Sequence, residues 1–193
     1  KIYTCQVKYF SRRRSFKTPC LWFYLIKKME IISQKLTKSN FNEFGDILSI
    51  ENEINYTTIN NGFTHKYDLS KFIGNKNNAS NKVAISIFRG LKRPNPLKIN
   101  MLECHPLGSQ SFMPLNGSSW VVIVCKGDRK KPNLKDLKCF IANKNQGVNY
   151  YPGTWHHPLI TLEENQDFMV VDRKNGTDNN LIEFCFNDIS VKL

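Results

Sequence analysis

The sequence lacks closely spaced cysteine pairs and long apolar runs. None of its six cysteines forms a CxxC pair, and four of them lie in short apolar segments: Cys104, Cys125, Cys139 and Cys185. This spacing disfavours zinc-finger chemistry and favours buried free thiols in a reducing cytoplasm. A membrane-spanning helix needs about 20 consecutive apolar residues, and the sequence offers no such run.

Acidic residues are absent from residues 1–28. This leader carries eight basic residues, whereas residues 29–193 carry 20 basic and 16 acidic ones, so most of the net charge of +12 lies in the leader. Binding to nucleic acid or to an acidic membrane would depend wholly on the leader, and we expect neither partner for the rest of the chain. We interpret residues 1–28 as a disordered or non-native basic extension before a natural start at Met29, and residues 29–193 as a single domain.

A signal peptide is the competing interpretation of the leader, because a basic stretch precedes an apolar one. The apolar run, Cys20 to Ile26, has only seven residues, and two lysines follow where small residues should form a cleavage site. Secretion is therefore disfavoured, and we expect a cytoplasmic protein.

Long helical patterns are scarce as well. From residue 83 onward, short β-branched and aromatic runs alternate with segments rich in Gly, Pro, Asn and Asp, which is typical of an all-β sandwich or barrel. The expected strands are 83–88, 99–104, 120–125, 139–142, 168–171 and 181–186. Residues 36–48 resemble a short capped helical turn, residues 73–82 a mobile surface loop, and residues 21–36 the only plausible long helix.

Two segments concentrate the polar chemistry of the chain. In ECHPLGSQ, Glu103 and His105 lie two residues apart, so on a strand they share one face, and Gln110 follows after a turn. In YYPGTWHHPL, a tight turn precedes His156 and His157. A solvent-facing polar pair is the simpler interpretation of the first segment alone, but three of the four histidines lie in these two segments. We therefore expect them to meet in one cavity.

Several longer stretches carry a family resemblance. LECHPLGSQSFMPLNG, NQGVNYYPGTWHHPL, DFMVVDR and NLIEF closely resemble the ureidoglycolate lyase family, over about residues 29–187 and most strongly over 99–183. The resemblance implies a cupin-like antiparallel jelly-roll β-barrel with a few short helices, usually a homodimer. It also implies cleavage of ureidoglycolate into glyoxylate and urea, in the breakdown of allantoin and purines.

The cupin resemblance also implies a ligand set. Cupins use His-x-His-x4-Glu followed by Pro-x-Gly-x2-His, and this chain matches the spacing with Glu103, His105, Gln110 and His156. These residues could hold a divalent metal, for which nickel is the first choice because it is the ion usually associated with the family. No organic cofactor is expected.

The implied elimination needs a base and an acid, for which His105, His156 and Glu103 are the candidates. Arg89 is the first choice to bind the substrate carboxylate, with a structural ion pair as its alternative. Tyr150 and Trp155 would close over the substrate, or else fill the barrel. On an extended chain His157 faces away from His156, so we expect it to be structural.

Two other functions are compatible with the same sequence. The same barrel could hydrolyse the ureido group and release ammonia, which demands an activated water and a stronger metal site than Gln110 suggests. Alternatively, it could be a non-catalytic cupin that binds a carboxylate, although binding alone does not need proton-transfer groups.

Overall fold

The computed structural model describes residues 29–51, 55–70, 83–173 and 180–193. The predictions for residues 1–28 and for the surface loop of residues 73–82 fall outside these residues. Among the described residues, no helix is long and apolar enough to cross a membrane.

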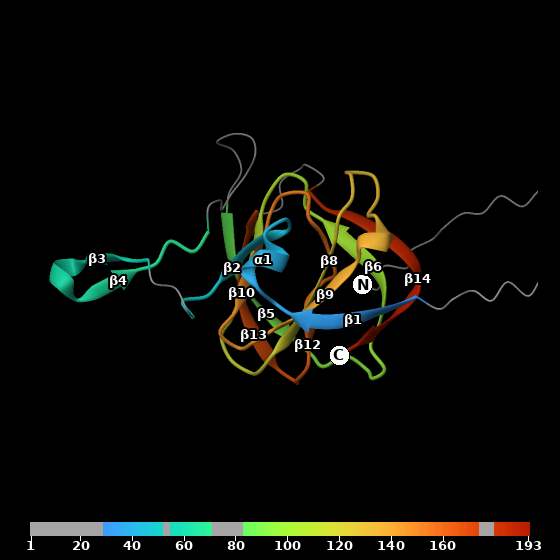
Figure 1. Cartoon of the computed structure of the whole chain (residues 1–193), viewed down its shortest axis with the longest axis horizontal. Coiled ribbons are helices and arrows are strands. Elements are labelled where there is room, and N and C mark those ends of the chain that lie inside the picture. Colours follow the sequence, from blue (N-terminus) through green and yellow to red (C-terminus); the bar gives the residue numbers. More distant parts are fainter. Residues whose placement is uncertain (1–28, 52–54, 71–82, 174–179) are drawn as a thin grey trace, which may run out of the picture.

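Strands make up nearly all of the regular structure, which confirms the all-β prediction (Figure 1). The strands are β1 (Glu30–Lys35), β2 (Gly45–Leu48), β3 (Thr57–Ile59), β4 (Thr64–Lys66), β5 (Val83–Gly90), β6 (Lys98–Cys104), β7 (Gln110–Pro114), β8 (Trp120–Cys125), β9 (Lys138–Ala142), β10 (Gly147–Tyr150), β11 (Trp155–His156), β12 (Ile160–Thr161), β13 (Gln166–Arg173) and β14 (Ile182–Lys192). The helical elements are α1 (Lys38–Phe41) and the 3₁₀ turns η1 (Asn60–Gly62) and η2 (Leu134–Asp136).

The strands form a closed ring, an open sheet and a hairpin. The ring runs β11-β6-β14-β1-β9-β8 and closes through a second pairing of β11 with β8. The five-stranded sheet has the order β2-β10-β7-β13-β5, and β3 pairs with β4. These pairings are antiparallel, as expected, except that β1 is parallel to both β14 and β9.

The first described strand also corrects a helix prediction. Residues 21–36 were the expected long helix. Residues 30–35 are instead strand β1, which lies in the ring between β9 and β14 and pairs with both. Pairing on both sides overrides the local helical pattern. The capped turn was predicted correctly at its start, because Thr37 and Asn40 form a reciprocal capping box at α1.

Two apolar cores lie on opposite faces of β8, which explains why its sequence is a continuous apolar run. All six residues of β8 are buried. Alternate side chains go to different clusters because successive strand residues point to opposite faces. Val121, Ile123 and Cys125 pack with Trp155 and other residues of the ring strands, whereas Trp120, Val122 and Val124 pack with Phe112, Val148 and Phe168 of the five-stranded sheet. The five-stranded sheet therefore packs against one side of the ring.

Candidate functional site

Two ring strands place a carboxylate beside an imidazole. β11 pairs with β6 so that His156 lies opposite Glu103 and Trp155 lies opposite Cys104. Trp155 and Cys104 belong to the core of the ring. Glu103 and His156 therefore project from the other face of these strands, toward the five-stranded sheet.

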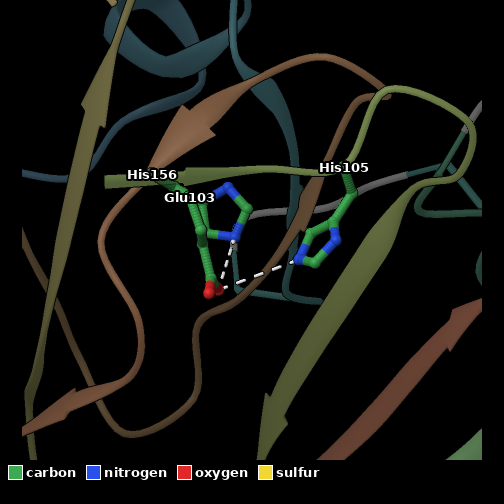
Figure 2. A group of neighbouring side chains, drawn as sticks. All are labelled: Glu103, His105 and His156. Carbon is green, nitrogen blue, oxygen red and sulfur yellow. Dashed lines mark ion pairs between the residues drawn. The ribbon is translucent and has the colours of Figure 1, made fainter. Parts of the chain in front are cut away.

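Glu103, His105 and His156 converge on one point (Figure 2). The Oε1 atom of Glu103 is 3.3 Å from Nε2 of His156 and 3.8 Å from Nε2 of His105. The two imidazole rings lie 5.4 Å apart between centroids. One ligand atom from each residue lies within 4.8 Å of the others, so the three side chains could hold a metal ion.

The five-stranded sheet contributes the fourth side chain. Gln110 begins β7, and its Oε1 atom is 3.1 Å from Nε2 of His156. Its amide nitrogen donates to Oδ2 of Asp172 at 3.3 Å, and the register of β13 places Asp172 directly opposite Gln110. This bond orients Gln110 so that its oxygen, rather than its nitrogen, faces His156. The structure thus brings together all four residues that the cupin-like spacing selected.

Backbone carbonyls fix the tautomers of both histidines. Nδ1 of His105 lies 2.8 Å from the carbonyl oxygen of Asn180, and Nδ1 of His156 lies 2.9 Å from that of Thr154. A carbonyl only accepts hydrogen bonds, so each Nδ1 is the donor and carries its hydrogen. Both Nε2 atoms therefore present a lone pair, or an added proton, toward Glu103.

This set of atoms fits a cation. The oxygens of Glu103 and Gln110 and the two Nε2 lone pairs are all electron donors, and they face one another. Nε2 of His105 is buried without a hydrogen-bond partner among the described residues. Mixed imidazole and oxygen ligands suit a divalent first-row transition metal better than calcium. Without a metal, these four residues can place a positive charge here only if an imidazole takes up a second proton.

The electrostatics of the site follow from the same contacts. Burial acts to raise the pKa of Glu103, but its interactions with the imidazoles of His105 and His156 outweigh it and hold this pKa far below its usual range. Burial acts to lower the pKa of His105, but Glu103 and the Asn180 carbonyl outweigh it and raise this pKa. Glu103 is therefore a carboxylate at neutral pH, and His105 holds a proton more strongly than a free imidazole does.

A layer of supporting residues holds these side chains in place. The ring of Tyr150 stacks on His156 at 4.2 Å with an interplanar angle of 14°, and burial raises the pKa of this phenol. Tyr150 therefore forms a wall behind His156. The side-chain oxygen of Asn180 accepts from the backbone of Leu107 at 2.8 Å, which fixes the turn after His105. Sequence reasoning missed Asp172 and Asn180, because contacts between distant segments bring them to the site: strand register for Asp172 and hydrogen bonds for Asn180.

A hollow of about 710 Å³ lies next to Glu103. Its lining combines apolar side chains, among them Phe112 and Leu159, with the cations Arg89, Lys92 and Arg93. Arg89 donates through two nitrogens to the carboxylate of Asp167 at 2.7 and 2.8 Å, which is the structural ion pair that the sequence left open. Among the described residues, no ion pair involves the side chain of Lys92 or Arg93.

The structure places Trp155 and His157 differently from His156. Trp155 lies inside the ring, where its indole nitrogen donates to the carbonyl of Asp128 at 2.7 Å, so it fills the barrel and does not line the hollow. Nδ1 of His157 donates to the carbonyl of Pro158 at 2.7 Å. Burial lowers the pKa of His157 to about 4.

Comparison with known proteins shows the family of this chain. The profile of the ureidoglycolate lyase family matches residues 28–192. The chain belongs to the ureidoglycolate lyase family. Ureidoglycolate lyase from Brucella anthropi is 42% identical over 164 residues, which cover 84% of this chain and 94% of that protein.

Two further relatives of the family have similar coverage. Ureidoglycolate lyase from Pseudomonas paraeruginosa is 44% identical over 156 residues, covering 80% of this chain and 89% of that protein. The protein of the same name from a Chelativorans species is 45% identical over 158 residues, covering 81% and 92%. The residues matched by the ureidoglycolate lyase profile include all four site residues.

Proposed function

We propose that this protein is a ureidoglycolate lyase, a carbon–nitrogen lyase that converts ureidoglycolate into glyoxylate and urea in the breakdown of allantoin and purines. The observation that supports it most directly is the convergence of Glu103, His105 and His156 beside a hollow, in a chain related to proteins named for this reaction.

The reaction breaks one carbon–nitrogen bond and transfers two protons. The hydroxyl of the substrate carbinol loses its proton, its oxygen becomes the aldehyde oxygen of glyoxylate, and the carbon–nitrogen bond breaks. The departing urea nitrogen takes the bonding electron pair and gains a proton. Both transfers need groups that exchange protons near neutral pH.

The chain offers two such groups, the imidazoles of His105 and His156, which face one carboxylate. Because both Nδ1 atoms are held by carbonyls, only the Nε2 atoms of His105 and His156 can take up or release a proton toward the substrate. The carboxylate of Glu103 lies between them and stabilises whichever imidazole is charged. The two imidazoles can thus serve as base and acid, and Tyr150 keeps the His156 ring in one plane.

A divalent metal, with nickel as first choice, would be held by Glu103, His105 and His156, together with the amide oxygen of Gln110. Such an ion would stabilise negative charge that develops on a substrate oxygen. Gln110 supplies no charge, so this set is weaker than one with a second carboxylate.

The cations of the hollow are the candidates for binding the substrate carboxylate. Arg89 was the first choice, but its guanidinium is already paired with Asp167. Arg93 lines the same hollow as Glu103, carries a fork of donors that matches a carboxylate, and has no ion pair among the described residues. We therefore rank Arg93 before Arg89 for this role.

Product analysis tests the proposal. Purified protein is incubated with racemic ureidoglycolate, and urea, ammonia and glyoxylate are quantified over time. Equal amounts of urea and glyoxylate are expected, without ammonia. Ammonia in place of urea would indicate hydrolysis of the ureido group. Tight binding without turnover would instead indicate a cupin that only binds a carboxylate, and either result would overturn the proposal.

Three other features complete the proposal. The protein acts in the cytoplasm, consistent with free cysteines at 104, 125, 139 and 185, of which the first three are buried. It works as a homodimer. Residues 1–28 are dispensable, so a chain that starts at Met29 is expected to keep full turnover and thermal stability, and a large loss of either would show that the leader takes part in the fold.

A further inference from the structure

The ring is closed by strand pairing at only one end of its seam. β11, which joins β6 to β8, is two residues long and pairs with the last two residues of β6, Glu103 and Cys104. Toward the start of β8 its partner is β12, through Val121 opposite Ile160. Among the described residues, no pairing joins β12 to β6. The hydrogen-bonded wall is therefore interrupted between β12 and the start of β6.

A hollow of about 470 Å³ lies at this interruption and is here named the seam hollow. The loop before β6, the strand β12 and the end of β14 line it, at the side of the barrel where Figure 1 marks the C-terminus. Its apolar lining includes Leu97, Ile160 and Val191, which are buried in the core of the ring. A cavity of this size with an apolar lining suits a small ligand that carries hydrocarbon surface.

Three exposed cations border the seam hollow. Lys92, Arg93 and Lys192 line it, and none of them has an ion pair among the described residues. The carboxylate of Glu164 accepts from the backbone nitrogen of Lys92 at 3.2 Å, so it holds the loop and does not pair with the ammonium group. No acidic side chain of the described residues lines the hollow, and a carboxylate on Leu193 would cancel only one of the three charges. The charge and the lining together favour an anion with an apolar chain.

Residues 92–94 form a wall between two hollows. Lys92, Arg93 and Pro94 line both the seam hollow and the hollow next to Glu103. A guanidinium that is paired with a carboxylate on one side is less available to a carboxylate on the other. Lys192, in contrast, lines only the seam hollow of these two. It therefore offers a way to alter the seam hollow without touching the proposed reaction.

We propose that the seam hollow is a second binding site, which takes an aliphatic monocarboxylate. The carboxylate lies at Lys192 and Arg93, and the hydrocarbon chain lies along the buried apolar lining. An occupant holds Arg93 and so weakens binding of the substrate in the hollow next to Glu103. This coupling rests on the proposed function, in which Arg93 binds the substrate carboxylate, and by linkage the substrate weakens binding of the occupant by the same factor.

Calorimetric titration of the full chain with hexanoate tests the site. Hexanoate should bind at least about tenfold more tightly than acetate, which lacks the chain, and than hexanol, which lacks the charge. Lys192→Ala should raise the dissociation constant for hexanoate about tenfold, because it removes a charged contact. Lys98→Ala is the matched control, since Lys98 begins β6, pairs with Asp188 at 3.6 Å and does not line the seam hollow. It should leave the dissociation constant unchanged.

A second variant tests the placement of the hydrocarbon chain. Leu162 lines the seam hollow and not the hollow next to Glu103. Leu162→Asp should weaken hexanoate binding about tenfold or more, because it sets a negative charge beside the ligand, and circular dichroism confirms that the variant is folded. Hexanoate that binds Lys192→Ala as tightly as the unmodified protein would overturn the proposed site, and so would equal binding of hexanoate and hexanol.

Steady-state kinetics test the coupling through Arg93. Hexanoate should raise KM for ureidoglycolate in the unmodified protein, and the same concentration should raise it much less in Lys192→Ala, whose turnover without hexanoate should be normal. An equal rise in both proteins would overturn the coupling, because hexanoate would then compete inside the hollow next to Glu103. Calorimetry does not depend on turnover, so hexanoate binding by a protein without lyase activity would support the site and overturn only the coupling.

Discussion

His156 and His157 are neighbours in the chain and are almost equally buried, at 1% and 6% exposure, yet their surroundings differ in kind. Nε2 of His156 faces the carboxylate of Glu103 at 3.3 Å and the amide oxygen of Gln110 at 3.1 Å. His157 makes a local bond to the Pro158 carbonyl, and burial depresses its pKa. One imidazole is placed among electron donors, and the other is kept neutral by its surroundings.

This contrast shows that burial alone does not identify a functional histidine. Burial acts on both rings, and the difference arises from which partners the backbone places nearby. β11 sets His156 opposite Glu103, whereas the chain leaves β11 before His157. Changing one imidazole or its partners while leaving the other intact separates the two roles.

The largest effect is expected when the trio loses His105. His105→Ala should lower kcat by about 10²- to 10⁴-fold if the imidazole transfers a proton. The free energy of unfolding should fall by only about 1–2 kcal/mol, since the substitution removes one hydrogen bond, from Nδ1 of His105 to the Asn180 carbonyl. The assay pairs turnover of ureidoglycolate with metal content. Parallel loss of metal and activity, partly restored by nickel or manganese, would assign His105 to metal binding; unchanged turnover would exclude it from the site.

A smaller effect is expected from the residue that orients Gln110. Asp172→Asn removes the charge and one of the two acceptor oxygens that orient the Gln110 amide, and weakening such a supporting contact typically costs about 10- to 100-fold in metal affinity or activity. Asp167→Asn is the matched control, because it lies on the same strand but pairs outward with Arg89. Metal titration and steady-state kinetics of both variants check this prediction, and equal losses would argue against a specific role for Asp172.

The hollow offers a third comparison, between a free cation and a paired one. Arg93→Ala should raise KM for ureidoglycolate by about tenfold, the cost of one charge-assisted hydrogen bond, with little change in kcat. Arg89→Ala should mainly remove the exposed ion pair with Asp167 and change KM less. The reverse order in steady-state kinetics would return the carboxylate-binding role to Arg89.

The sequence predicted much of this site for a physical reason. Glu103 and His105 share a strand face by their spacing, and the apolar runs marked β5, β6, β8, β9, β13 and β14. Parallel pairing of β1, the register of Asp172 with Gln110, and the contact between Asn180 and His105 depend on residues far apart in the chain. Local patterns carry no information on such pairings. The burial of Trp155 in the ring likewise follows from the pairing of β11 and not from its turn.

The smallest effect on activity, with a distinct effect on stability, is expected at His157. Its folded pKa of about 4 lies below the unfolded value, so its contribution to stability is complete above about pH 6.5 and is lost as the pH falls toward 4. Each pH unit in that window costs at most about 1.4 kcal/mol. The free energy of unfolding of His157→Gln should therefore fall less steeply between pH 6.5 and 4 than that of the unmodified protein, as measured by urea denaturation. Parallel curves would mean that His157 does not account for the acid sensitivity.

The most direct test compares His156→Gln and His157→Gln in one assay of urea and glyoxylate release, with circular dichroism to confirm that both variants are folded. His156→Gln should lower kcat by at least about 10²-fold, because it removes an imidazole that faces Glu103. His157→Gln should retain most of the turnover at pH 7.5, where the unmodified residue is neutral. An inactive His157→Gln protein beside an active His156→Gln protein would contradict the assignment of the site.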